Sequence, residues 1–138
     1  MAVSLQSLLE SQAVVVADGG MGTLLFARGL VRGSAPELWN VEHPDAVCQI
    51  HADYIAAGAQ IILTNSFGGS RLRLKSHGLD GRTAELNRSA ASLARAEADR
   101  ADHPVVVAGS MGPTGALLAP LGDLEYDEAA AVFAEQAA

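Results

Sequence analysis

The sequence predicts an α/β fold built on a parallel sheet with crossover helices. Three short apolar runs indicate buried strands, at residues 14–17, 60–64 and 104–108. Stretches with helical spacing of apolar residues separate these runs, so the predicted order is strand, helix, strand, helices, strand and helix. In sheets of this kind ligands bind at the carboxyl ends of the strands, which directs attention to the residues that follow each run.

The N-terminal part of the chain predicts two short helices around the first strand. Leucines at helical spacing over residues 4–11 indicate an amphipathic packing helix. The run Val14–Ala17 is rich in β-branched residues and bounded by polar ones, which predicts a strand buried on both faces. Residues 21–28 form a second short helix in this interpretation, and its free N-terminal amides would face the same space as Asp18.

A loop over residues 29–40 precedes the clearest helix of the sequence. The loop carries Trp39, which either anchors it by burying a large ring or lines a pocket. Pro44 and Asp45 are well placed in a first helical turn, and Gly58 is typical of the position after a helix end. These signals predict a helix that opens at the proline and closes before the glycine.

The same predicted helix carries Cys48 and His51, three residues apart, which is one spacing found among metal ligands. Two ligands without a third nearby do not make the closed tetrahedral site that zinc prefers, and a cysteine within a helix is more often part of the core. We therefore expect these two side chains to be packing residues.

The second half of the chain predicts three further helices. A short one surrounds Leu72 and Leu74, a long one covers residues 83–100, and a last one begins near Asp127. The apolar stripe of the last helix consists of Ala130, Phe133, Ala134 and Ala137. This helix ends without a glycine cap or a breaker, so we expect the chain to stop inside the element.

Composition and charge favour a small-molecule ligand over a nucleic acid or a membrane. The chain has 138 residues, of which 49% are hydrophobic and 18% charged, as expected for one soluble globular domain. Its net charge of −7 argues against nucleic acid and anionic membrane surfaces as partners. The single cysteine, Cys48, excludes an internal disulfide and indicates a reducing, cytoplasmic setting. Neither a secretory signal nor a long apolar span is found in the sequence.

Polar or small residues directly follow each of the three predicted strands. They are Asp18, then Thr64 and Asn65, then Gly109 and Ser110. If the strands are parallel neighbours, these residues meet at one edge of the sheet and form a polar arc around a common point. The alternative is that loops between strands and helices need such residues for their turns, which would explain any one of the three groups.

The glycine cluster after the first strand does not fit a dinucleotide site. In Gly20-Met21-Gly22-Thr23-Leu24-Leu25, a leucine occupies the position of the third glycine of G-x-G-x-x-G. No acidic residue ends the second strand to hold a ribose, and no Walker lysine is present. Because the carboxylate of Asp18 would also repel phosphate, a ligand that carries an ammonium group fits this position better.

Five motifs run in order along nearly the whole chain. They are D-G-G-M-G-T at 18–23, the segment 43–59, T-N-S-F at 64–67, Asn87 with Ala94 and Arg95, and A-G-S-M-G-P-T-G at 108–115. Together they resemble the N-terminal part of the homocysteine S-methyltransferases. That family includes betaine-homocysteine methyltransferase and the homocysteine-binding module of cobalamin-dependent methionine synthase.

The resemblance implies a (β/α)₈ barrel, the TIM barrel, of which this chain supplies about three βα units. Residues 1–138 would then be an incomplete homocysteine-binding barrel domain, truncated within its last helix. The implied function is transfer of a methyl group to the sulfur of homocysteine, which gives methionine. In the family, zinc held by three cysteine thiolates activates that sulfur. Those cysteines belong to later strands, so the zinc ligands are expected outside this chain and the fragment alone is expected to be inactive.

The resemblance also implies substrate-binding roles for six residues at the strand ends. Asp18 matches the aspartate that receives the amino group of homocysteine, and Gly19 and Gly20 match the backbone that closes over the amino acid. Thr64 and Asn65 match the residues at the rim after the second strand, and Gly109 matches the rim after the third. The resemblance leaves the catalytic residues unknown and matches no residue of this chain to a metal ligand.

Two other functions stay open on the sequence. The chain is alternatively a non-catalytic half that completes a barrel with another polypeptide or with a copy of itself, since a third strand without a fourth leaves an open sheet edge. An unrelated α/β enzyme that acts on an amino acid is the other alternative. The sequence does not identify the methyl donor, which in this family is betaine, a methylated sulfonium compound, or methyl-tetrahydrofolate acting through cobalamin.

Overall fold

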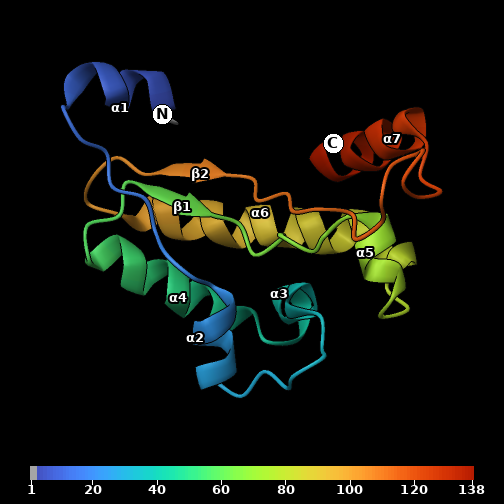
Figure 1. The fold of residues 1–138 in the computed structure, drawn as a ribbon. Coiled ribbons are helices and arrows are strands. Elements are labelled where there is room, and N and C mark those ends of the chain that lie inside the picture. Colours follow the sequence, from blue (N-terminus) through green and yellow to red (C-terminus); the bar gives the residue numbers. More distant parts are fainter. Residues whose placement is uncertain (1–2) are drawn as a thin grey trace.

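The computed structural model describes residues 3–138 and contains a small parallel sheet with helices packed on one side (Figure 1). Strand β1 (Ile61–Leu63) pairs in parallel with β2 (Val106–Ala108), with Ile62 opposite Val107. On the other edge of β1, Ala17 forms a parallel bridge with Ile61. The predicted strand order and the parallel direction are therefore confirmed.

The prediction of a regular, doubly buried strand over residues 14–17 is wrong. Only Ala17 forms a bridge, and the side chains of Val14 and Val16 are 72% and 51% exposed. The backbone of this segment forms hydrogen bonds only on the side that faces β1. Ile61 N–H donates to Val16 O at 3.1 Å, and Asp18 N–H donates to Ile61 O at 2.8 Å. A β-branched run becomes a buried strand only when other elements cover it, and no element within residues 3–138 covers these valines.

Helices form most of the described structure, and the bounds of the predicted helices agree with the sequence patterns to within a few residues. The predicted loop over residues 29–40 is wrong at its end, where the 3₁₀ turn η1 and the start of helix α3 lie. The α-helices are α1 (Leu5–Ser11), α2 (Gly22–Ala27), α3 (Trp39–Glu42), α4 (Pro44–Ala56), α5 (Arg71–Lys75), α6 (Thr83–Arg100) and α7 (Tyr126–Ala137). Two 3₁₀ turns are η1 (Pro36–Leu38) and η2 (Asp80–Arg82). Across residues 3–138, none of the helices has the length and apolar character needed to cross a membrane.

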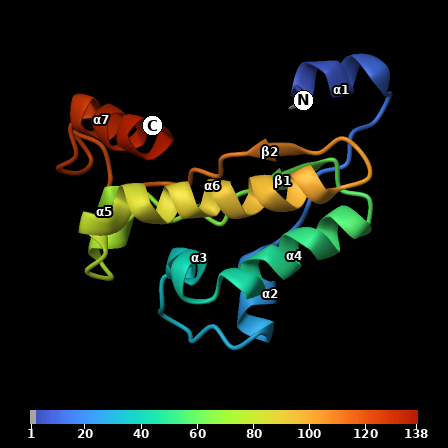
Figure 2. The same cartoon turned by 180° about the vertical axis from the view of Figure 1, so that it is seen from behind.

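Helices α4 and α6 hold the sheet from below in Figure 1, and Figure 2 shows α6 running along the strands. A core of Ile55, Ile62, Ala94 and Val105 joins the two helices to the two strands. Each fully buried aliphatic side chain contributes roughly 1.5–3 kcal/mol to the stability of the fold. This core therefore holds β1, and with it the end of the strand, in a fixed position. The edge at which β1 ends is the one that carries the predicted site.

A second core lies between α2, α4 and the loop that follows α2. It consists of Leu25, Leu30, Val47 and Ile50, with Trp39 packed against it. The ring of Trp39 also lies 4.4 Å from the ring of His43. Of the two interpretations of this tryptophan, the structure supports the one in which it anchors the loop.

Helix α7 presents a different face from the one that the sequence predicts. Its buried residues are Ala129, Val132 and Gln136, whereas Ala130 is exposed. The buried face of α7 is thus rotated about the helix axis from the predicted face. A hydrogen bond explains this rotation, because Gln136 Nε2 donates to Ser66 O at 2.8 Å and draws that side of the helix inward. The predicted stripe of Ala130, Phe133, Ala134 and Ala137 is therefore wrong by about one residue.

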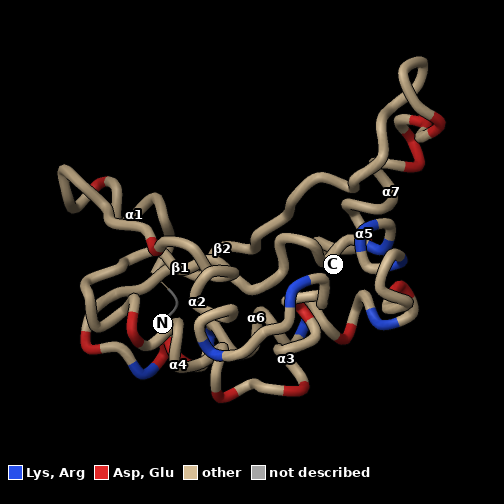
Figure 3. Tube along the Cα trace, turned by 60° about the horizontal axis from the view of Figure 1, so that its bottom comes forward, with Lys and Arg blue, Asp and Glu red and all other residues tan. Residues whose placement is uncertain are grey.

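The chain is uncharged from the residues just before β2 to residue 122, a long tan stretch in Figure 3. Residues 104–122 contain no Asp, Glu, Lys or Arg. Several large apolar side chains in this segment are exposed, with Leu117 at 67% and Leu121 at 85%. Exposed apolar residues that gather on one segment indicate a surface that another element covers.

Candidate functional site

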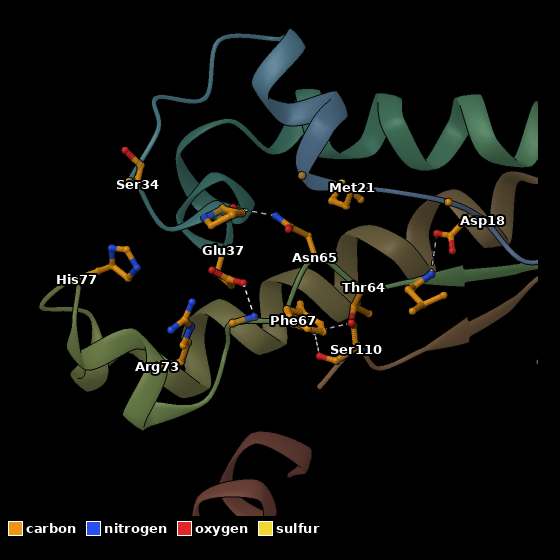
Figure 4. Close-up of a pocket in the computed structure, with 17 residues that line it drawn as sticks. Asp18, Met21, Ser34, Glu37, Thr64, Asn65, Phe67, Arg73, His77 and Ser110 are labelled. Carbon is orange, nitrogen blue, oxygen red and sulfur yellow. Dashed lines mark hydrogen bonds between the residues drawn. The ribbon is translucent and has the colours of Figure 1, made fainter. Parts of the chain in front are cut away.

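A cavity of about 510 Å³ opens at the carboxyl end of β1. Its walls come from the loop after Ala17, the η1 turn, the loop after β1 and helix α5 (Figure 4). Four of the six predicted binding residues line it, namely Asp18, Gly19, Thr64 and Asn65. The position agrees with the expected location of a ligand in a parallel sheet.

Asp18 has one carboxylate oxygen in use and one without a partner. Leu63 N–H donates to Oδ2 at 2.9 Å, which ties the carboxylate to the end of β1. Oδ1 is buried and makes no hydrogen bond within residues 3–138. Burial raises the pKa of Asp18 above its usual value, and the backbone N–H of Leu63 opposes this rise. A positively charged donor at Oδ1 would remove the cost of this buried negative charge.

Thr64, Ser66 and Ser110 form a closed hydrogen-bonded ring that joins the loops after β1 and β2. The backbone N–H of Ser110 donates to Thr64 Oγ1 at 3.0 Å, and Ser66 Oγ donates to Ser110 O at 2.8 Å. Since the Ser66 hydroxyl proton is used in this way, Thr64 Oγ1 donates to Ser66 Oγ across 2.6 Å. Thr64 therefore holds the rim of the cavity together.

Asn65 is 4% exposed and is engaged by the protein itself. Its amide nitrogen donates to Pro36 O at 2.9 Å and to Asn40 Oδ1 at 3.0 Å, so both of its N–H groups are in use. In return, Asn40 Nδ2 donates to Asn65 O at 2.8 Å. This pair of asparagines clamps η1 and α3 onto the loop after β1, which sets the far wall of the cavity.

The remaining predicted residues are glycines with different surroundings. A Cβ at Gly19 would come within 2.9 Å of the Tyr54 hydroxyl oxygen, and that hydroxyl donates to Gly20 O at 2.8 Å. The backbone of these two glycines thus rests against α4. Gly109 lies apart from the first cavity and lines a neighbouring one of about 700 Å³, which shares Thr64, Ser66 and Ser110 with it. The binding roles of all six residues stay predictions.

Four further side chains that the sequence did not single out line the first cavity: Glu37, Phe67, Arg73 and His77. Glu37 is 4% exposed, and Gly68 N–H donates to its Oε1 at 2.7 Å. These residues come from loops and from the short helix α5, where apolar periodicity carries no information. The one usable signal was the acidic residue directly after a loop proline, at Pro36–Glu37.

The residues present do not fit a zinc site. No group of three His, Cys, Asp or Glu side chains suited to a metal ion occurs within residues 3–138. Cys48 is a free cysteine on α4, and burial, followed by the negative charge of Glu97, raises the pKa of its thiol. His51 is fully buried with neither ring nitrogen hydrogen-bonded. Both are packing residues between α4 and α6, as the sequence predicts.

Comparison with known proteins points to one family. A family model described as homocysteine S-methyltransferase matches residues 15–138. The homocysteine S-methyltransferase of Escherichia coli (strain K12) is 37% identical over 145 aligned residues, which cover 96% of this chain and 46% of that protein. The methionine synthase of Mycobacterium tuberculosis (strain ATCC 25618 / H37Rv) is 38% identical over 84% of this chain and 10% of that protein.

Solved structures agree with these relatives. The homocysteine methyltransferase MmuM from Escherichia coli, in its metallated form, superposes with a TM-score of 0.69 and 33% identity, over 80% of this chain and 42% of that chain. Its apo form covers 96% of this chain and 47% of that chain, with a TM-score of 0.64 and 25% identity. The predicted fold class, the N-terminal part of a (β/α)₈ barrel, is confirmed.

The chain spans about half the length of its Escherichia coli relative and about a tenth of the methionine synthase. The match nevertheless extends over nearly all of its own residues, including the loops that build the cavity. On the strength of the family model and of these relatives, the chain belongs to the homocysteine S-methyltransferase family.

Proposed function

We propose that this chain is the N-terminal, homocysteine-binding part of an enzyme that transfers a methyl group to the sulfur of homocysteine. The observation that carries the proposal is the buried, unpartnered Oδ1 of Asp18 at the carboxyl end of the sheet. An α-ammonium group supplies the positive charge and the N–H donors that this oxygen lacks. Family membership supports homocysteine as the amino acid that brings this group.

The chain's own residues bind and orient the substrate in this proposal. Asp18 holds the ammonium group, and the glycines beside it leave room for the backbone of the amino acid to approach closely. The ring of Thr64, Ser66 and Ser110 keeps the rim rigid, so the substrate sulfur is directed to one position. The thiolate then attacks the methyl carbon; a new S–C bond forms, and the bond between that carbon and the donor breaks with its electron pair leaving on the donor.

Zinc is expected from the resemblance, and one of the solved relatives is described as metallated. Since no suitable group of ligands occurs within residues 3–138, we assign no step of the reaction to a metal held by this chain. We expect the ligands in the part of the enzyme that continues the barrel. The uncharged, partly exposed segment 104–122 supports such a continuation, because further strands and helices would bury it.

A second candidate function rests on the same segment. The chain would act as a barrel half that is completed by a separate polypeptide or by its own copy. The exposed Leu117 and Leu121 favour some covering partner without distinguishing a partner in the same polypeptide from one in another. The oligomeric state of the purified polypeptide separates the two, because a partner in the same polypeptide gives a monomer.

The test uses the polypeptide encoded by the whole gene that carries residues 1–138. We expect it to bind homocysteine in a calorimetric titration and to form methionine from homocysteine and a methyl donor. Treatment with a chelator should abolish methyl transfer. Absence of homocysteine binding by the metal-loaded polypeptide would refute the proposal.

A further inference from the structure

A tight turn at residues 66–69 follows β1 and separates the two cavities. It closes on itself, because Gly69 N–H donates to Ser66 O at 2.9 Å. Its first three residues line the first cavity. Ser66 also lines the second cavity, together with Asn87 of α6 and Gln136 of α7. The turn is therefore the wall between the cavities, and its position sets the shape of the first one.

Two side-chain amides hold this turn from α6 and α7. Gln136 Nε2 donates to Ser66 O at 2.8 Å, and Asn87 Nδ2 donates to Gly69 O at 2.8 Å. The amides are also joined to each other, since Gln136 Nε2 donates to Asn87 Oδ1 at 3.2 Å. The second N–H of Asn87 donates to Thr83 O at 2.8 Å, one helical turn earlier. All four amide N–H groups are thus in use, which fixes the orientation of both side chains.

Gly69 is the point at which the two amides reach the backbone. A Cβ there would lie 2.5 Å from Asn87 Oδ1, 2.9 Å from Ser66 O and 3.0 Å from Gln136 Nε2. Only glycine leaves the space in which the two amides approach their carbonyl groups.

The hydrogen bond from Gln136 is not needed to satisfy a carbonyl group. Ser66 O already accepts from Gly69 N–H, and Gln136 Oε1 is itself buried without a partner within residues 3–138. An apolar side chain at this position would avoid the cost of burying an unpaired amide oxygen. What the amide adds is therefore a fixed position for the turn rather than a net gain in stability.

The other side of the turn carries groups that shape the first cavity (Figure 4). Phe67 is 63% exposed, and its carbonyl oxygen accepts from Gly112 N–H at 2.8 Å. Gly68 N–H donates to Glu37 Oε1 at 2.7 Å, which ties the turn to η1. The hydroxyl of Ser66 belongs to the hydrogen-bonded ring at the rim. A shift of the turn would thus move the rim and the neighbouring wall together.

We propose that Asn87 and Gln136 are positioning residues, which hold the 66–69 turn so that the sulfur of bound homocysteine meets the methyl donor in one geometry. This inference rests on the proposed function and adds to it two residues that do not line the substrate cavity. Asp18, on a different loop, holds the ammonium group, so affinity for homocysteine depends little on the turn. The reaction rate does depend on it, because a misplacement of about 1 Å costs on the order of 100-fold in rate.

The experiment uses the polypeptide encoded by the whole gene and the variants Gly69→Ala, Asn87→Ala and Gln136→Ala. Calorimetric titration gives the Kd of homocysteine. Methyl transfer is tried with glycine betaine, S-methylmethionine and methylcobalamin, and the donor that the unsubstituted protein uses serves for all variants. We expect kcat to fall about tenfold to a hundredfold and Kd to change less than about threefold. Because both amides act through one turn, Asn87→Ala with Gln136→Ala should lower kcat by less than the product of the single effects.

Amide hydrogen exchange tests the turn itself, without substrate. The peptide that contains residues 64–70, followed by mass spectrometry, should exchange at least about tenfold faster in Gln136→Ala than in the unsubstituted protein. Gly81→Ala is the matched control for Gly69→Ala, because its added Cβ meets no atom within 4 Å. Leu8→Ala removes a buried side chain of α1 and should lower the melting temperature. Neither control should change kcat or the exchange of this peptide.

An unchanged kcat or an unchanged exchange rate in Gln136→Ala overturns the inference. A rise in Kd as large as the fall in kcat also overturns it, because the turn would then serve binding. So does a fall in kcat that Leu8→Ala reproduces at the same loss of melting temperature, which would make Gln136 a residue of stability alone. If the unsubstituted polypeptide does not bind homocysteine, or accepts no methyl group from the three donors, the proposed function fails instead. The exchange rates then decide whether the two amides hold the turn.

Discussion

The loop after residue 17 and the loop after β1 stand side by side at one edge of the sheet, and their polar groups are used differently. In the second loop, Thr64, Asn65 and Ser66 are hydrogen-bonded to other parts of the protein. In the first loop, Asp18 keeps one buried oxygen without a partner. Polar residues at equivalent positions after the two strands therefore differ in whether the protein itself satisfies their hydrogen bonds.

The difference teaches that polar residues at strand ends divide into those whose hydrogen bonds the protein satisfies and those that keep a buried polar atom without a partner in the described residues. A satisfied buried group stabilises the fold, whereas an unsatisfied one destabilises it until something binds. Substitution in the second loop should thus affect folding first, and substitution of Asp18 should affect binding first. Three of the four predictions below test this division, and the one on His51 tests the α4–α6 scaffold beneath the two loops.

The largest effect is expected for Asn65→Ala. It leaves Pro36 O and Asn40 Oδ1 without their donor in a buried place, which should lower the free energy of unfolding by about 2–5 kcal/mol. Denaturant titration measures the change. The control is Gln49→Ala, which removes an exposed amide whose hydrogen bond is to Asp53 one turn away, and which should change stability by less than about 0.5 kcal/mol. Equal stability of the two variants would contradict a building role for Asn65.

Acid should destabilise the α4–α6 scaffold through His51. Burial lowers the pKa of this histidine from 6.5 to about 4, and Glu97 on α6 only partly opposes the effect. Its contribution to stability is therefore complete above pH 6.5 and is lost as the pH falls toward 4. The loss amounts to roughly 3 kcal/mol. The free energy of unfolding, measured by denaturant titration between pH 7 and pH 4, should fall as the pH falls. The substitution His51→Leu should make this dependence on pH weaker, whereas substitution of the exposed His77 should leave it unchanged.

Asp18→Asn should separate binding from folding. The variant keeps the shape of the side chain and removes its charge, so the affinity for homocysteine should fall on the order of 10- to 100-fold. Stability should stay the same or rise, since a desolvated negative charge is removed from the protein. Calorimetric titration and thermal melting of the same sample measure both quantities. If Asp18→Asn loses stability and keeps its affinity for homocysteine, Asp18 serves the fold and not binding.

The smallest expected effect is a pH dependence of binding that follows Asp18 alone. Because burial raises its pKa, the carboxylate becomes protonated at a higher pH than an exposed aspartate does. The Asp18 carboxyl group stabilises the fold while it is protonated, below its ordinary pKa of 3.8. This contribution is lost as the pH rises through the raised pKa of the folded protein. Ammonium binding needs the ionised form, so homocysteine affinity should fall as the pH drops through that raised value. Measuring in the His51→Leu background removes acid unfolding from the result, and Asp18→Asn should abolish the dependence.

The helices were largely predictable because their signals are local. Pro44 at the start of α4 and Gly58 after its end gave that helix correctly, and the bounds of α6 agree with the predicted 83–100. The strand at 14–17 failed because β-branched residues indicate burial only if a neighbour covers them. Helix α7 failed by one residue because a long-range hydrogen bond from Gln136 outweighed a weak apolar stripe.

The part of the cavity wall around Asp18 and Thr64 was predictable, and the part around Glu37 and Arg73 was not. Asp18 and Thr64 follow strands, and parallel topology brings strand ends together whatever the intervening sequence. Glu37 and Arg73 come from separate loops and helices, so only the packing of η1 and α5 around the loop after β1 brings them to one cavity. Apart from the proline before Glu37, nothing in their local sequence distinguishes these two residues from other charged residues of the chain.

The sequence by itself determined the order of strands and helices, the parallel direction of the sheet and the edge at which the cavity opens, because these follow from residue periodicity and chain connectivity. Only the tertiary structure decided which polar groups at that edge are satisfied. Whether Asn65 bonds to Asn40, and whether Oδ1 of Asp18 finds a partner within residues 3–138, depends on distances between segments far apart in the chain. Hydrogen bonding is short-ranged and directional, so it is fixed only when packing is complete.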